Sequence, residues 1–127
     1  MGLAFLIGRI AVGYYFLMNS YNHLFKSGHM TGYAASKGVP SPKAAIIVSG
    51  LLLLAGGLSV LLGVAVIWGL IALLVFMIPV TFMMHNYWKE TDPMDRANQK
   101  ISFWKNIAII GLLLMLFAVP TPWPFAL

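Results

Sequence analysis

Long apolar stretches separated by short polar segments dominate this sequence. About 20 apolar residues are enough for a helix to cross the roughly 30 Å hydrocarbon layer of a membrane. The run from Ala44 to Met84 contains no charged residue. As one helix it would extend about 61 Å, so we predict that it turns back near Gly63. The pattern therefore predicts four spans, at about residues 2–25, 44–62, 65–88 and 102–119.

The segments between the spans carry signals for helix starts. Residues 26–43 are polar, glycine-rich and aromatic, so we expect a loop that ends in an N-cap at Ser41, followed by proline at the first helical position. Asp92 precedes another proline, and Asp95 lies three residues after it, which is typical of a helix N-terminus. We expect that helix to begin in the membrane interface and to continue into the fourth span.

The composition excludes a soluble protein. Hydrophobic residues fill 61% of the 127 positions, charged residues fill 9%, and the mean hydropathy is +0.89. A soluble domain usually contains about 25% charged residues, and a chain of this size cannot bury so much apolar surface away from water. We therefore expect an all-α, integral membrane four-helix bundle that forms a single transmembrane domain over residues 1–127. The absence of cysteine excludes thiol chemistry on this chain, and no motif indicates nucleic-acid binding.

The basic residues predict the orientation in the membrane. Seven of the eight Lys and Arg residues lie in or beside the connections that follow the first and third spans, and only Arg9 lies elsewhere. By the positive-inside rule, residues 26–43 and 89–101 are then cytoplasmic. Four spans place both termini on the other side of the membrane, outside.

Several polar side chains are predicted to meet at one depth. Asn19 and His23 share one helix face near the end of the first span, His85 ends the third, and Lys105 and Asn106 begin the fourth. Polar groups within a membrane are expensive and often functional, and histidine changes charge near neutral pH. These residues could bind a polar headgroup or a quinone ring, or move a proton. Alternatively, they only anchor the helix ends at the interface, as do the aromatic residues at a similar level, Trp88 and Trp104.

Arg9 is predicted to lie in the opposite half of the bilayer from His23. No acidic residue lies in any predicted span to neutralise its charge. We expect its guanidinium to reach the outer headgroups, a backbone carbonyl, an aromatic face or the carboxylate of Leu127. The functional alternative is an anionic substrate group or a quinone oxygen.

A stripe of small residues follows one face of the second span and indicates close helix packing. The partner helix is either in this chain or in a neighbouring one. The stripe consists of Ser49, Gly56, Ser59 and Gly63.

Four ordered motifs resemble the DoxX family of small bacterial and archaeal membrane proteins. The first is IGRIAVGYYFLMNSYNHL, with Gly-Arg followed by an aromatic run and a polar end. The second is YAASKGVPSPKAAIIVSGLLLLAGGLSVLLG, with a Tyr-Ala-x-x-x-Gly-Val-Pro loop and a Gly-Gly-Leu-Ser helix. TFMMHNYW and FWKNIAIIGLLLM complete the set with His-x-x-Trp and Lys-Asn-x-x-x-x-Gly. Together they cover nearly the whole chain.

The resemblance implies a four-helix bundle in the inner membrane of a bacterial or archaeal cell. The family takes its name from a subunit of an archaeal thiosulfate:quinone oxidoreductase, and other members are linked to a membrane complex for oxidative-stress and thiol defence. Because this chain lacks cysteine, thiol or sulfur chemistry would take place on a partner. The polar residues that match the family's motifs are Arg9, His23, Lys37, His85, Lys105 and Asn106.

Our first hypothesis is a membrane subunit of a quinone-linked redox system, which is an enzyme only as part of an oxidoreductase complex. It would bind a quinone or lipid-like ligand within the bundle and carry no covalently bound cofactor. His23 or His85 would exchange protons with the quinone oxygens, and Arg9 would hold an anionic partner group or fix its helix. The residues expected to orient the headgroup are Asn19, Lys105 and Asn106, and those expected to line the apolar wall are Tyr14, Trp88 and Trp104.

The second hypothesis is a non-catalytic accessory subunit of a larger membrane complex. The small-residue stripe and the C-terminal PTPWPFAL sequence would make its contacts. Besides membrane lipids, the expected partners are further copies of the chain or other membrane subunits, and no nucleic acid. A small transporter is a third reading, although no acidic residue within the spans would couple transport to protons or sodium.

Overall fold

The computed structural model describes residues 2–127, and these fold into helices with no strand among them. The helices are α1 (Gly2–Phe25), α2 (Gly28–Ser36), α3 (Pro42–Leu62), α4 (Val66–Met84), the short 3-10 helix η1 (Tyr87–Lys89) and α5 (Pro93–Phe117). Four of them, α1, α3, α4 and α5, are long and apolar enough to cross a membrane. The expectation of an all-α, multi-pass membrane bundle is confirmed.

Helix α3 is the centre of the bundle because it packs against both α1 and α4, and α5 packs against the far side of α4. Small residues allow this close approach. A Cβ atom on Gly57 would lie 3.0 Å from the side chain of Leu17 in α1, and one on Gly56 would overlap the side chain of Leu73 in α4. The small-residue stripe therefore packs mainly within this chain, which answers the question that the sequence left open.

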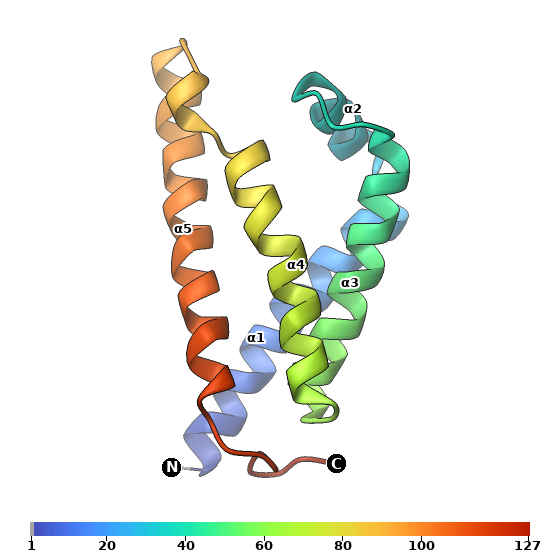
Figure 1. Ribbon diagram of the computed structural model, residues 1–127, viewed down its shortest axis with the longest axis vertical. Coiled ribbons are helices and arrows are strands. Elements are labelled where there is room, and N and C mark those ends of the chain that lie inside the picture. Colours follow the sequence, from blue (N-terminus) through green and yellow to red (C-terminus); the bar gives the residue numbers. More distant parts are fainter. Residues whose placement is uncertain (1) are drawn as a thin grey trace.

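The start of α1 and the C-terminus lie at one end of the bundle, and the α1–α3 and α4–α5 connections lie at the other (Figure 1). We call these the terminal end and the loop end. This is the arrangement that four spans require. Which end faces the cytoplasm remains a prediction.

A buried arginine fastens the C-terminal segment, residues 118–127, across the terminal end. Arg9 is 4% exposed, and its two terminal nitrogens donate hydrogen bonds to the carbonyl oxygens of Pro124 (2.7 Å) and Phe125 (3.0 Å). Its guanidinium carbon lies 6.0 Å from the centre of the Trp123 ring, which is itself buried. Of the partners expected for Arg9, the protein uses backbone carbonyls and an aromatic face.

Two local expectations at the loop end need correction. Residues 26–43 are not wholly a loop, because they contain α2. Ser41 does not cap α3 with its side chain, since it adopts a left-handed backbone conformation with φ 45° and makes no capping hydrogen bond. At the start of α5 the prediction is correct: the carboxylate of Asp92 accepts a hydrogen bond of 3.0 Å from the backbone N–H of Asp95.

Candidate functional site

A cavity of about 530 Å³ lies at the loop end, and all five α-helices contribute to its walls. Its apolar floor includes the buried side chains of Phe16, Leu53 and Met77. All three histidines of the chain line it. The other polar residues of the wall include Asn19, Tyr33, Ser49, Asn98, Gln99, Ser102, Lys105 and Asn106.

Hydrogen bonds hold the imidazole of His85 in one orientation on the α4–α5 side of the cavity. His85 Nδ1 lies 2.7 Å from the side-chain oxygen of Gln99. The amide nitrogen of Gln99 donates to the hydroxyl of Tyr33, and that hydroxyl donates to the carbonyl oxygen of Met84 at 3.1 Å.

This network determines the tautomer of neutral His85. The Tyr33 hydroxyl has one proton, and the carbonyl of Met84 can only accept it. Gln99 must therefore direct its NH₂ group toward Tyr33 and its oxygen toward His85, so His85 carries its proton on Nδ1. The lone pair of Nε2 is then left to accept a hydrogen bond or a proton.

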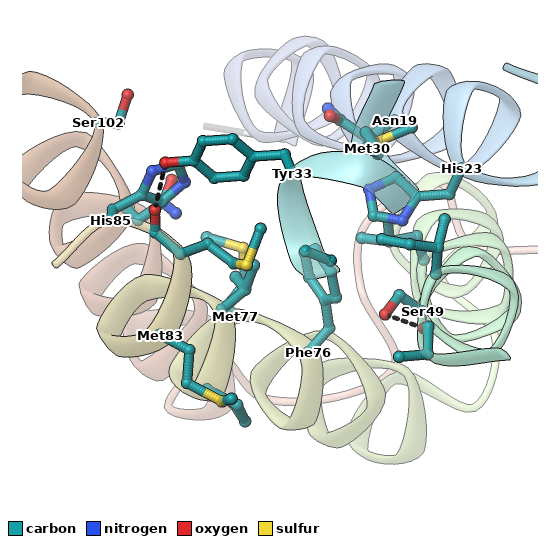
Figure 2. A pocket seen from close by; sticks show the side chains of 18 of the residues that line it. Asn19, His23, Met30, Tyr33, Ser49, Phe76, Met77, Met83, His85 and Ser102 are labelled. Carbon is teal, nitrogen blue, oxygen red and sulfur yellow. Dashed lines mark hydrogen bonds between the residues drawn. The ribbon is translucent and has the colours of Figure 1, made fainter. Parts of the chain in front are cut away.

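His23 lies on the opposite side of the cavity, with Phe76 and Met77 between the two histidines (Figure 2). Its side chain is 8% exposed, and its ring meets that of Phe76 edge to face with centroids 5.4 Å apart. The buried Nδ1 has no hydrogen-bond partner. Leaving a buried polar atom unsatisfied costs about 1–3 kcal/mol, so His23 Nδ1 is a cost to stability beside the cavity.

Donor and acceptor groups from α1 and α5 complete the polar wall. The amide nitrogen of Asn19 donates to the carbonyl of Tyr15 at 2.8 Å, which leaves its amide oxygen to accept a bond. Asn106 is 5% exposed within the bundle and lines the cavity beside Lys105. The ammonium of Lys105 lies 6.0 Å from the centre of the Tyr15 ring, so it spans the space between α5 and α1.

Helix α2 covers the loop end of the cavity and is held there by ionic contacts. Lys37, at the C-terminal end of α2, bonds the side-chain oxygens of Asn86 (2.6 Å) and Glu90 (2.7 Å). Burial lowers the pKa of Lys37, but the hydrogen bond to Glu90, the charge of Glu90 and the interaction with Tyr33 together raise it above the ordinary value. Lys37 is therefore charged at neutral pH, and the contact persists.

The structure brings together five of the nine residues predicted for the ligand site: Asn19, His23, His85, Lys105 and Asn106 all line the cavity. Arg9 lies at the other end of the bundle. The three aromatic residues expected on the apolar wall do not line the cavity. Tyr14, Trp88 and Trp104 are 63%, 46% and 54% exposed, and Trp88 and Trp104 pack on the ring of Phe103. Phe16 and Phe76 are among the side chains that take their place.

The sequence reasoning missed Tyr33 and Gln99. Tyr33 was not predicted because it lies in residues 26–43, which the sequence pattern assigned to a loop. Gln99 precedes the expected fourth span, but it lies three residues before Ser102 and seven before Asn106, on one face of the helix that begins after Asp92. That spacing could have revealed it. Among residues 2–127, no cluster of three or more His, Asp or Glu side chains could hold a metal ion.

Comparison with known proteins supports the resemblance carried by the motifs. The model of the DoxX family matches residues 4–86, which include nearly all of α1, the whole of α2 to α4, and His85. The chain is 28% identical over 111 residues to the inner membrane protein YphA of Escherichia coli (strain K12), covering 87% of this chain and 79% of that protein. No solved structure matches. Because the family model matches more than half of its length, the chain belongs to the DoxX family.

Proposed function

We propose that this protein is a membrane subunit of a quinone-linked redox system and binds a quinone or similar lipid-like ligand in the loop-end cavity. The observation that carries the proposal is that two histidines, the buried His23 and the partly buried His85, line opposite sides of an apolar cavity. The tautomer of His85 leaves its Nε2 atom as an acceptor. A quinone ring is flat and apolar with an oxygen at each of two opposite edges, so a ring bound between the histidines would present one oxygen to each side.

The proposed chemistry assigns proton exchange to this chain and electron transfer to a partner. Two-electron oxidation of a hydroquinone would release two protons: one hydroxyl would donate its hydrogen bond and then its proton to His85 Nε2, and the opposite hydroxyl would lose its proton to His23. The two electrons would pass to a redox centre on a partner subunit, because no cysteine or redox-centre motif is present in this sequence. Asn19, Lys105 and Asn106 would bond the ring oxygens and orient the ring.

The comparisons and the charge pattern support a location for this activity. The Escherichia coli relative is an inner membrane protein by name, and we propose the same membrane for this chain. The basic residues at the loop end support, by the positive-inside rule, a position of the cavity near the cytoplasmic face. Protons would then be exchanged with the cytoplasm.

The accessory-subunit alternative has less support, because the chain uses part of each expected contact surface internally. Gly56 of the small-residue stripe packs against α4. Trp123 of the C-terminal segment is buried, although Phe125 and Leu127 remain exposed.

Quinone binding to the purified protein in nanodiscs tests the proposal. We expect saturable binding of decylubiquinone, weakened about 10- to 100-fold by His85→Ala, or about 1.4–2.8 kcal/mol. Gln99→Leu should weaken binding about tenfold, because His85 Nδ1 loses its acceptor and the ring proton is then free to move to Nε2. Asn22→Ala is the matched control, since Asn22 adjoins His23 but does not line the cavity. No saturable binding to the unmodified protein, or equal binding to all four proteins, would overturn the proposal.

A further inference from the structure

The helices of the bundle leave one side of the cavity without close packing. The closely packed pairs are α1 with α3, α3 with α4, and α4 with α5. Helices α1 and α5 are therefore the two edges of an open arrangement, and they run apart toward the loop end (Figure 1). At the loop end, α2 and the contact of Lys37 with Glu90 cover the cavity. The α1–α5 side is therefore the side of the cavity that close helix packing does not seal.

A second, smaller hollow lies between these two edges. Its volume is about 200 Å³, and its walls come from α1 and α5 alone: Ala11, Val12, Tyr15, Phe16, Ile109 and Leu112. Tyr15 and Phe16 also line the larger cavity. This hollow, which we call the groove, therefore lies next to the cavity, and Tyr15 and Phe16 form a wall common to both.

Polarity changes in the same direction along both helices. On α1 the polar Asn19 lines the cavity, and the apolar Ala11 lines the groove about 12 Å further along the helix axis. On α5 polarity falls from Lys105 to Leu112, about 10 Å. The cavity and the groove together therefore form a site that is polar near the loop end and apolar toward the middle of the bilayer.

Resting on the proposed function, we propose that the groove holds the hydrocarbon tail of the ligand whose headgroup occupies the cavity. The ligand class is thereby narrowed to amphiphiles with one flexible apolar chain, such as isoprenoid quinones. A transmembrane helix of a partner is a poor occupant, because close helix packing requires small residues on the facing surface. Here the walls carry the bulky side chains of Tyr15, Phe16 and Leu112.

The test compares two probes that share a naphthoquinone ring. Menadione has no tail, and menaquinone-4 carries a chain of isoprenoid units. Ala11→Phe would fill the groove from an exposed position of α1. We expect it to weaken menaquinone-4 binding in nanodiscs at least about tenfold and to leave menadione binding unchanged. Ala55→Phe is the control, because Ala55 is exposed on α3 and lines neither cavity nor groove.

The outcomes separate this inference from the proposed function. If Ala11→Phe binds menaquinone-4 as the unmodified protein does, while His85→Ala loses both probes, the tail lies elsewhere and the inference is wrong. If the unmodified protein binds neither probe, the proposed function fails. Leu112→Trp blocks the groove from the opposite wall and replaces Ala11→Phe should that variant not fold. An equal loss of both probes in either groove variant would also contradict the inference.

Discussion

The two ends of this bundle are built from the same four helices but differ in how they are filled. At the terminal end, small residues bring α3 against α1 and α4, and side chains such as Val60, Leu70 and Leu73 are fully buried. At the loop end, the same helices surround a cavity of about 530 Å³ lined by histidines, amides and a lysine. Close packing of small residues therefore fills one end of the bundle, whereas the other end retains a cavity.

The polar groups of the two ends are also used differently. At the terminal end, the two terminal nitrogens of Arg9 donate to carbonyls of its own chain, although its buried Nε has no partner. At the loop end, the buried Nδ1 of His23 has no partner, and histidines, amides and a lysine line a cavity. Hydrogen bonds that the chain makes to itself, as at Arg9, serve stability. We therefore expect substitutions at the two ends to affect different measurements.

The largest effect is expected where α3 and α4 meet. Gly56→Leu would push its side chain into Leu73 and bring a Cβ atom within 3.0 Å of the carbonyl oxygen of Gly69. Overpacking of this kind costs about 3 kcal/mol or more where the backbone must move. Thermal unfolding in detergent should show a large loss of stability, or no folded protein. The matched variant is Gly111→Leu, because a Cβ at Gly111 has no neighbour within 4 Å. Equal stability of both variants would contradict the packing argument.

The sequence predicts the packed end well because its signals are local. An uncharged run of twice the length of one span requires a turn, and Gly63 provides it with a φ of +71°. Small residues repeated along one helix face predict close packing. Which helix packs against that face depends on contacts between distant parts of the chain, so only the structure assigns α1 and α4 as its partners.

The open end is harder to predict because its geometry arises from tertiary contacts. The positions of residues along the predicted spans fix their depth in the membrane. This depth correctly predicts that five polar residues come together: Asn19, His23, His85, Lys105 and Asn106. Depth does not fix the direction in which a side chain points, so Tyr14, Trp88 and Trp104 were assigned to a wall that they do not form. Helix α2 was missed because it is short and contains two glycines, Gly28 and Gly32, which lower its helix propensity.

An intermediate effect is expected at Arg9. Arg9→Met keeps the length of the side chain but removes two hydrogen bonds from a charged donor, each worth about 1.5–3 kcal/mol. The free energy of unfolding should fall by about 3 kcal/mol, and quinone binding should persist, because Arg9 lies far from the cavity. Arg96→Met is the control, since Arg96 is exposed on α5. A variant that keeps its stability and loses the quinone would instead assign Arg9 to ligand binding.

The smallest effect is expected at the lid formed by α2. Lys37→Met removes the contacts with Asn86 and Glu90, and partly exposed ion pairs are worth up to about 1 kcal/mol. Hydrogen exchange of α2 backbone amides at neutral pH should become faster, whereas Lys43→Met, at an exposed lysine, should leave it unchanged. If both variants exchange as the unmodified protein does, Lys37 does not hold the lid.

The pH dependence of this contact follows from the direction of the pKa shift. The pKa of Lys37 is raised above its ordinary value of 10.5 by the hydrogen bond and charge of Glu90, together with Tyr33, against the opposing effect of burial. A group with a raised pKa contributes its full stability below the ordinary value and loses it as the pH rises through the folded-state value. Unfolding of the unmodified protein and of Lys37→Met should therefore differ by a constant amount across neutral pH. The two should converge only in strongly alkaline buffer. A difference that already vanishes near neutral pH would mean that another group, and not the ammonium of Lys37, keeps α2 over the cavity.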